Sequence, residues 1–536
     1  MSGLPWTQHL ILLPILLPLL AGAALIPVNE TRHGLKFAVN LFCNAILLLT
    51  ALFLFWHTDQ ELWPGSIGVY LAANWAAPFG IALVADRLSA LMLVLTALLS
   101  LAVLVFSQQG WSRIGVHFHS LFLFLLMGIN GAFLTHDLFN LFVFFEVMLA
   151  ASYGLVLHGY NLTRIRASLQ YIAVNLVASL LFLIGIALIY ATTGTLNMAD
   201  LGPRVASLAA ADQALFQLGA VILALAFLTK GAMWPLGFWL PVTYAAASPP
   251  VAAMLVLMTK VGIYAIVRVW PLAFGVGPLA GFALEALFWA GLMTLLFGSI
   301  GMLASQEAGR MAGYGAIISS GTLMAVVGIN QPDLLTAGLY YLLGSTLATA
   351  AFLLVAGLIE RIRTPGAALL ALTMEAFAIE EKPDEPVGVG IPGALAFLGL
   401  AFAACALVMT GLPPLSGFVA KFSLFHLLLN GDGALIREVW LFLGLILISG
   451  LCGIIALMRF GVRTFWASGN LQPPSLHASE VVPVSLLLAL CVAMTIFASP
   501  LLAYLERASG DIATPASYVE RVLAAPVLSG PTGDPR

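Results

Sequence analysis

The sequence has little charge, which sets it apart from soluble proteins at once. Only 8% of its 536 residues are charged, whereas 61% are hydrophobic, and a typical soluble domain carries about 25% charged residues. The net charge of −3 excludes a basic surface for nucleic acid. A soluble fold cannot hide this much apolar surface, so the composition predicts a polytopic protein of the lipid bilayer.

Cysteine is also sparse, and what there is carries no recognisable chemistry. The four cysteines, Cys43, Cys405, Cys452 and Cys491, lie in apolar segments and lack the spacing of a disulfide framework or metal site. We therefore expect no disulfide, no metal and no cofactor. The first apolar segment lacks the basic start and cleavage site of a signal peptide, so we expect a retained helix.

Long apolar runs are abundant, and most approach or exceed the roughly twenty residues that cross a bilayer as a helix. The sequence therefore predicts an all-α fold. We expect about fourteen transmembrane helices, at 8–27, 36–57, 79–106, 114–134, 138–158, 167–191, 213–239, 244–270, 277–303, 311–330, 335–359, 391–426, 437–463 and 482–506.

These spans group into larger units. The expected divisions are three N-terminal helices (1–113), two five-helix units (114–270 and 277–463), a C-terminal helix (482–506) and a short, loosely ordered tail (507–536). The second unit contains the only long polar connection, 360–390, which we interpret as a cytoplasmic loop. Lysine and arginine are more frequent near helix ends on the side of the membrane where this loop lies. This bias predicts that this side is cytoplasmic and that both termini lie outside.

Two similar stretches indicate an internal repeat. "WPLGFWLP" at 234–241 and "PPLSGFVAKF" at 413–422 each place Pro-Leu, small residues and Phe within a long apolar span. Both spans are predicted to break, at Pro235 and at Pro413–Pro414. They are the seventh and twelfth helices, and this odd offset inverts topology, as in transporters with broken helices near the midplane. Because Pro235 has no N–H, we expect the carbonyl of Gly231 to lose its helical partner.

Charge inside the membrane is rare and therefore informative. Three of the five lysines, Lys230, Lys260 and Lys421, fall inside predicted spans, and Glu146 is the one acidic residue that is clearly central in a span. Each such charge costs roughly 2.5–3.5 kcal/mol at a helix centre, so it needs a partner or a function. We predict that Glu146 pairs with Lys230 and that the lysines relay protons, because a buried lysine can lose its proton. The alternative is that each lysine reaches to an interface.

Polar residues in neighbouring spans could hydrate such a path, although hydroxyl groups also pack helices together. The candidates are Tyr171, Asn175, Thr259, Ser345, Thr346 and Thr349, with Ser319, Ser320 and Thr322 on the tenth helix. Weaker candidates lie near span ends, where an interfacial position is the alternative: His136, Asp137 and Glu285.

The motifs around these charges resemble a known family. "HDLFNLFVFFEVMLAAS" contains Glu146, "FLTKGAMWPLGFWLPVTYAAASPPVAAMLVLMTKVGIYA" contains Lys230 and Lys260, and "MTGLPPLSGFVAKF" contains Lys421. Together they resemble the antiporter-like membrane subunits shared by respiratory complex I, membrane-bound hydrogenases and multisubunit Na⁺/H⁺ antiporters of the Mrp/Pha type. The resemblance implies fourteen helices, inverted five-helix repeats at helices 4–8 and 9–13, and a Glu/Lys axis along the membrane plane.

Within that family the sequence is most similar to the D-type subunits of the Mrp/Pha antiporters. Complex I relatives typically carry His where this chain has Gly237, and often His and Lys on the eleventh helix, where this chain has Gly344 and Thr349. Without a basic residue on that helix, the connection between Lys260 and Lys421 would depend on water and hydroxyl groups.

The resemblance implies a proton-translocating subunit of a Na⁺ or K⁺/H⁺ antiporter in a bacterial inner membrane, not an enzyme. Its expected partners are a large A-type subunit, small membrane subunits, the bilayer and the transported ions. One alternative is a proton-pumping, non-redox subunit of complex I or of a membrane-bound hydrogenase. Another alternative is a mainly structural subunit whose lysines no longer transfer protons.

Overall fold

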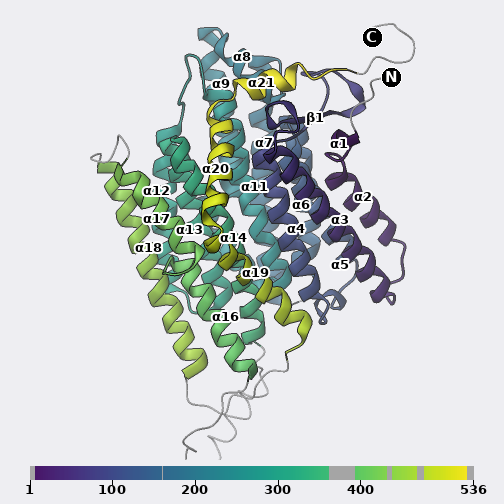
Figure 1. Ribbon diagram of the computed structural model, residues 1–536, viewed down its shortest axis with the longest axis vertical. Coiled ribbons are helices and arrows are strands. Elements are labelled where there is room, and N and C mark those ends of the chain that lie inside the picture. Colours follow the sequence, from purple (N-terminus) through teal and green to yellow (C-terminus); the bar gives the residue numbers. More distant parts are fainter. Residues whose placement is uncertain (1–5, 160, 361–392, 431–436, 467–475, 528–536) are drawn as a thin grey trace, which may run out of the picture.

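The chain folds as a bundle of long helices (Figure 1). The computed structural model describes residues 6–159, 161–360, 393–430, 437–466 and 476–527. Twelve helices in this part of the chain are long and apolar enough to cross a membrane: α3 (His33–Asp59), α4 (Arg87–Ser107), α6 (Leu138–Val156), α7 (Leu162–Thr193), α9 (Ala210–Lys230), α11 (Pro249–Phe274), α12 (Leu284–Ala304), α13 (Ala308–Ile329), α14 (Pro332–Glu360), α16 (Gly393–Thr410), α18 (Arg437–Gly461) and α19 (Ala478–Ile496). The protein is therefore a multi-pass membrane protein.

Shorter helices complete the bundle. The predicted count of fourteen spans adds α2 and α5 to these twelve helices and joins α16 to α17 in one span. Fourteen therefore stays a prediction, as do the inverted repeats. The shorter elements are α1 (Trp6–His9), α2 (Leu13–Leu25), α5 (Phe118–Leu134), α8 (Met198–Ala206), α10 (Trp239–Ala246), α17 (Ser416–Asn430), α20 (Ala498–Ala513) and α21 (Ala516–Leu523).

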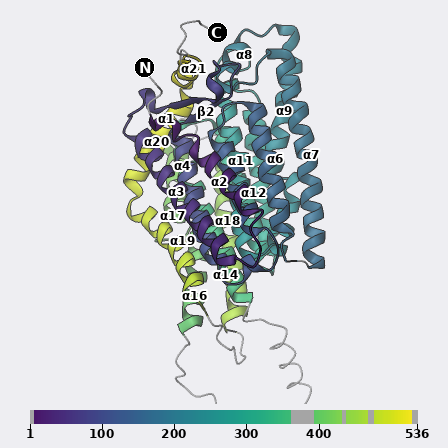
Figure 2. The same cartoon turned by 90° about the vertical axis from the view of Figure 1, so that its right-hand side faces the viewer.

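Two helices form the centre of the bundle. The most apolar window of α11 is entirely buried and that of α14 is 94% buried, whereas those of α3, α7 and α9 are 39% buried. In Figures 1 and 2, α11 and α14 run through the interior, and Figure 2 shows α7 and α9 side by side at one edge. A polar residue on α11 or α14 is thus surrounded by protein rather than by lipid.

Both predicted helix breaks are present, and both rely on a glycine. A Cβ at Gly237 would lie 2.1 Å from the carbonyl oxygen of Ala232, and one at Gly417 would lie 1.9 Å from that of Val408. No side chain fits at such distances, so each glycine allows the chain to fold back against the backbone that precedes it.

The position of the first break corrects one expectation. We predicted a helix through 213–239 interrupted at Pro235, but α9 ends at Lys230 and Ala232 is left-handed, with φ of 56°. The break therefore begins directly after the lysine. The following stretch forms α10 rather than the start of the next span, so α11 begins at Pro249 and not at 244.

Further corrections concern span ends. Strands β1 (Gly68–Leu71) and β2 (Ala82–Ala85) form an antiparallel hairpin where the span 79–106 was predicted to begin. The helix α4 starts only at Arg87, because Asp86 and Ser89 form a reciprocal capping box there. The residues of β2 are all apolar and buried, like those of a buried helix, so hydropathy alone placed the start of this span too early.

The C-terminal segment is more ordered than predicted. The expected helix at 482–506 divides at Phe497 into α19 and α20, and α21 follows where a loose tail was expected from 507. Tyr518 and Val522 of α21 are buried. The helices α1, α8 and α21 lie at one end of the molecule (Figure 1), which we call the upper end.

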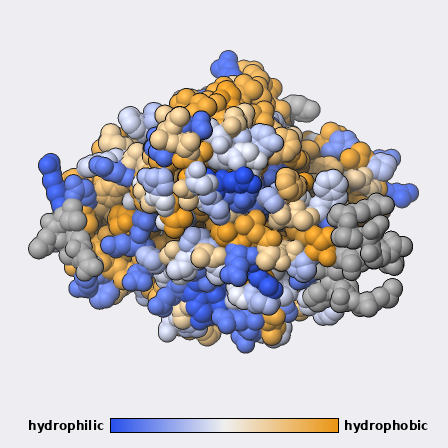
Figure 3. Space-filling model, turned by 90° about the horizontal axis from the view of Figure 1, so that it is seen from above, coloured by the Kyte–Doolittle hydropathy of each residue, from blue (hydrophilic) through white to orange (hydrophobic). Residues whose placement is uncertain are grey.

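The surface of the upper end mixes hydrophilic and hydrophobic residues (Figure 3), as expected where a protein meets both headgroups and water. The predicted cytoplasmic loop 360–390 lies outside the described residues, apart from Glu360 at the end of α14.

Candidate ion pathway

The first charged position, Glu146, lies on α6 and faces α7. Its carboxylate accepts a short hydrogen bond from the Ser179 hydroxyl. Within the described residues, no ion pair joins Glu146 to Lys230, so the predicted direct pair is not formed. Instead the Lys230 amine lies 4.9 Å from the centre of the Phe145 ring. Adjacent residues on a helix point about 100° apart, so Phe145 faces α9 while Glu146 faces α7.

Lys230 is the last residue of α9 and is 4% exposed. Its amine has no hydrogen-bond partner in the part of the chain that the structure describes. The broken backbone beside it is partly satisfied, because the N–H of Trp234 donates to the Thr294 hydroxyl on α12, at 2.9 Å. A buried amine of this kind requires either water or a change of protonation state.

The two polar residues predicted on α7 differ in what they contact. Tyr171 exchanges a hydrogen bond with Ser152 of α6 at 2.7 Å, and its hydroxyl also reaches the Met258 sulfur on α11. Asn175 donates back to the Tyr171 carbonyl of its own helix. Tyr171 thus links α6, α7 and α11, whereas the bond that Asn175 donates is local to its helix.

Lys260 lies on α11 at the centre of the bundle and is 1% exposed. Its amine donates to the Ser319 hydroxyl on α13 at 2.7 Å. Ser319 in turn exchanges a hydrogen bond with Ser345 on α14 at 2.9 Å. Two hydroxyl groups therefore extend from the lysine toward the second half of the molecule, and hydroxyls can both give and accept a proton.

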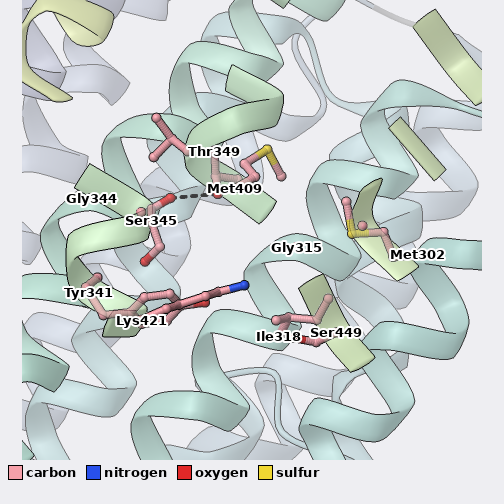
Figure 4. Close-up of a pocket in the computed structure, with 14 residues that line it drawn as sticks. Met302, Gly315, Ile318, Tyr341, Gly344, Ser345, Thr349, Met409, Lys421 and Ser449 are labelled. Atoms are coloured by element: carbon pink, nitrogen blue, oxygen red, sulfur yellow. Dashed lines mark hydrogen bonds between the residues drawn. The ribbon is translucent and has the colours of Figure 1, made fainter. Parts of the chain in front are cut away.

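Lys421 on α17 lines the same cavity as Ser345, the second of these two hydroxyl groups. Ser345 lines a cavity of about 20 Å³ together with Lys421, Tyr341 and Ser449, which is space for about one water molecule. In Figure 4 the Lys421 and Tyr341 side chains overlap, and the Lys421 amine points into this cavity. The amine also donates to the Thr410 carbonyl at 2.7 Å, at the end of α16. The second break thus supplies a backbone oxygen to its lysine.

The remaining predicted polar residues differ in what they contact. Thr259 and Thr346 donate to carbonyls of their own helices, Val256 and Leu342, which is the usual bond of a packing hydroxyl. Thr349 donates to the Ser345 carbonyl and also lines the cavity. The prolines Pro413 and Pro414 lie in the connection between α16 and α17, with a cis bond between them.

Two of the weaker candidates have local roles. The Asp137 carboxylate caps α6 by accepting from the Asn140 N–H at 2.8 Å, and burial raises the pKa of Asp137 above its ordinary value. Glu285 is exposed in the first turn of α12, as the interfacial interpretation expected.

The third weak candidate, His136, belongs to a buried cluster that the sequence analysis missed. Its Nδ1 shares a hydrogen bond with the Tyr518 hydroxyl at 2.8 Å. Burial, together with nearby Arg268, lowers the pKa of His136 to about 3, so the imidazole is neutral. Arg268 forms two hydrogen bonds with Asp86, at 2.6 and 2.8 Å. The four-residue spacing of Lys260, Tyr264 and Arg268 on one helix face was the available signal.

A family model described as "NADH:quinone oxidoreductase/Mrp antiporter, TM" matches residues 135–449. The chain is 49% identical over 532 residues to a probable D-type subunit of a K⁺/H⁺ antiporter of Rhizobium meliloti, covering 97% of this chain and 98% of that protein. It is 33% identical to a D-type subunit of a Na⁺/H⁺ antiporter of Alkalihalophilus pseudofirmus, covering 96% of this chain and 99% of that protein.

Solved structures agree with these similarities. A chain in the structure of the Mrp complex from Dietzia sp. DQ12-45-1b is similar with a TM-score of 0.83 and 27% identity, covering 97% of this chain and 100% of that one. A chain of respiratory complex I from Thermus thermophilus gives a TM-score of 0.74 at 23% identity, covering 97% of this chain and 100% of that one. At that identity the second comparison shows a shared fold.

Proposed function

The chain belongs to the proton-antiporter membrane family of NADH:quinone oxidoreductases and Mrp antiporters, and on that basis we propose that it is the D-type subunit of a multisubunit monovalent cation/H⁺ antiporter. It translocates protons in the bacterial inner membrane, with both termini on the outer face. The family points to a transporter, and we assign the chain no catalytic reaction.

The transported cation is Na⁺ or K⁺. The Rhizobium meliloti relative is named for K⁺ and the Alkalihalophilus pseudofirmus relative for Na⁺. Because those relatives are named as subunits and the similar solved structure is a complex, we propose that this chain works with a large A-type subunit and small membrane subunits. Lipid-facing helices such as α7 and α18 present many exposed apolar side chains for such partners or for lipid.

The observation that carries the proposal is the hydroxyl bridge at the centre of the bundle. Lys260 contacts Ser319, Ser319 contacts Ser345, and Ser345 lines the cavity that contains Lys421. A proton that leaves Lys260 needs to cross only two hydroxyl groups and the water-sized cavity to reach Lys421. No basic residue is needed on α14, where complex I relatives often carry one.

Glu146 and Lys230 form the other half of the path. Lys230 interacts electrostatically with Glu146 across a distance that leaves no direct contact, and its amine rests on an aromatic ring. Because Glu146 can turn between Ser179 and the lysine, we propose that this site takes up the proton. Transfer to Lys260 then needs water beside the break after Lys230, where non-helical backbone is tolerated next to a hydrated space.

The test removes the bridge without removing a charge. In the assembled antiporter, Ser319→Ala and Ser345→Ala should each reduce the Na⁺- or K⁺-dependent dissipation of ΔpH in everted vesicles at least tenfold. The reason is that each variant removes one of the two hydroxyl groups that the proton must cross. In Ser319→Ala the bond donated by Lys260 is also lost, and a hydrogen bond to a charged group is worth about 1.5–3 kcal/mol. Ser299→Ala is the matched control, since Ser299 is a buried serine on α12 that donates only to Leu295 within its helix.

Equal exchange rates in all three variants and in the unmodified complex would refute the bridge as the proton route. Loss of exchange in Ser299→Ala as well would indicate a general effect of removing buried hydroxyls. Ser319→Thr, which keeps the hydroxyl, should retain most of the activity.

A further inference from the structure

The face of α11 that carries Lys260 continues to the upper end of the molecule. Tyr264 and Arg268 follow at four-residue intervals, so the three side chains lie in one row. Eight residues of helix place Arg268 about 12 Å above Lys260. The row is closed at its upper end by Asp86, which caps α4 and binds Arg268 through both carboxylate oxygens.

The row is buried and tightly hydrogen-bonded. Arg268 is 7% exposed and Asp86 is 4% exposed. The Tyr264 hydroxyl donates to the Phe133 carbonyl at 2.7 Å and accepts from Arg268 at 3.2 Å. Arg268 rather than Asp86 therefore contacts Tyr264, so the positive end of the ion pair faces Lys260.

The C-terminal helices cover this pair from above. The Tyr518 ring of α21 lies 5.2 Å from the Arg268 guanidinium, and its hydroxyl bonds to His136. In α20, Tyr504 donates to the Arg87 carbonyl at 2.8 Å, and Asp511 pairs with the Arg87 guanidinium at 2.7 Å. Figure 1 shows α20 and α21 following one another up to the upper end.

We propose that Arg268, held by Asp86 and covered by Tyr518, is a barrier that stops protons from leaving Lys260 toward the upper face. This inference rests on the proposed proton path through Lys260. Arginine stays protonated at any accessible pH, so its charge is permanent. A proton moving up the row meets a like charge in a water-excluded region, whereas the Ser319 hydroxyl offers it a route without such a charge. The barrier makes lateral transfer to Lys421 the favoured direction.

The proposal predicts a proton leak when the barrier is removed. We would reconstitute the assembled antiporter in proteoliposomes without Na⁺ or K⁺, impose a pH gradient, and follow its decay with a pH-sensitive dye and a permeant anion to balance charge. The double variant Asp86→Asn, Arg268→Gln removes both charges but retains polar groups, so no buried charge is left unpaired. The gradient should decay at least fivefold faster than in the unmodified complex.

The control removes another Asp–Arg ion pair at the same end of the molecule. Asp200 and Arg204 of α8 form an ion pair one helical turn apart, and Arg204 is about half exposed. The double variant Asp200→Asn, Arg204→Gln should leave the leak unchanged. An unchanged leak in the folded, assembled Asp86/Arg268 double variant would overturn the proposal.

A second variant covers the case in which the double variant does not assemble. Tyr518→Leu leaves the ion pair intact and removes the aromatic cover, and it should increase the leak about twofold. A leak at the unmodified level in Tyr518→Leu would then overturn the proposal. Cation-dependent exchange is measured separately in the same vesicles, so failure of the barrier (no leak) is distinguishable from failure of the proton path (no effect of Ser319→Ala on exchange).

Discussion

Gly411 provides a direct test of how the second break positions its lysine. It ends α16 with φ of 78°, in the left-handed region, and a Cβ there would lie 2.5 Å from Cδ and 2.9 Å from Cε of Lys421. Gly411→Ala therefore combines two penalties. The left-handed backbone costs an alanine roughly 1–2 kcal/mol, and the lysine stem must move away.

The movement of Lys421 threatens its hydrogen bond to the Thr410 carbonyl, which lies at 2.7 Å. A bond from a charged donor is worth about 1.5–3 kcal/mol, so the total loss is roughly 2.5–5 kcal/mol. We expect Gly411→Ala to lower the apparent melting temperature of the purified complex and to reduce cation-dependent exchange in everted vesicles by tenfold or more.

Gly399 on the same helix is the matched control. A Cβ there would meet no atom within 4 Å, and alanine in a helix interior is favoured over glycine by roughly 0.5–1 kcal/mol. Gly399→Ala should therefore melt at the same or a higher temperature and exchange normally. The reasoning fails if Gly411→Ala matches the unmodified complex in both measurements, because the lysine would then not depend on the glycine.

Two buried polar contacts that are not part of the proposed bridge between Lys260 and Lys421 lead to two other predictions. The pKa of His136 is about 3 in the fold against 6.5 as its ordinary value, so the unfolded chain takes up this proton first as pH falls. This group should therefore lower the free energy of unfolding by roughly 1.4 kcal/mol between pH 7.5 and 5.5. The melting temperature of His136→Gln should fall less over that range than that of the unmodified complex, and an equal fall in both would contradict the prediction. Thr294→Val removes the acceptor of the Trp234 N–H, which should destabilise the complex by about 1–3 kcal/mol, whereas Thr294→Ser should restore stability; equal melting of all three forms would contradict it.

The long apolar spans and the helix breaks could be predicted because they depend on local sequence. Mean hydropathy identifies a span, and Pro-Leu followed by a small residue identifies a break. The hairpin of β1 and β2 was missed because its residues are as apolar as those of a helix. The relation of Glu146 to Lys230 was missed for another reason: sequence gives the helix but not its rotation, and Phe145 rather than Glu146 faces α9.

The buried pair of Asp86 and Arg268 shows most clearly what local sequence cannot predict. The two residues are 182 positions apart, and each lies close to an end of its predicted span, where a lone charge normally reaches water. Only the packing of α4 against α11, covered by α21, removes both charges from solvent. The spacing of Lys260, Tyr264 and Arg268 on α11 can be seen in the sequence, but the pairing of Arg268 with Asp86 cannot.

The two breaks use the same packing device to create different lysine environments. In each, a glycine without a Cβ lies against an earlier carbonyl, that of Ala232 in the break itself for Gly237 and that of Val408 near the end of α16 for Gly417. Lys230 comes before its break and its amine meets a ring, whereas Lys421 comes after its break and is bonded to the Thr410 carbonyl. An amine without a fixed acceptor can reorient toward Glu146 at little cost, but an amine that donates to a backbone oxygen is held in place. We therefore propose that Lys230 takes part in proton uptake and that Lys421 receives the proton at a fixed point. On this proposal, the order of lysine and break along the chain would give the path its direction.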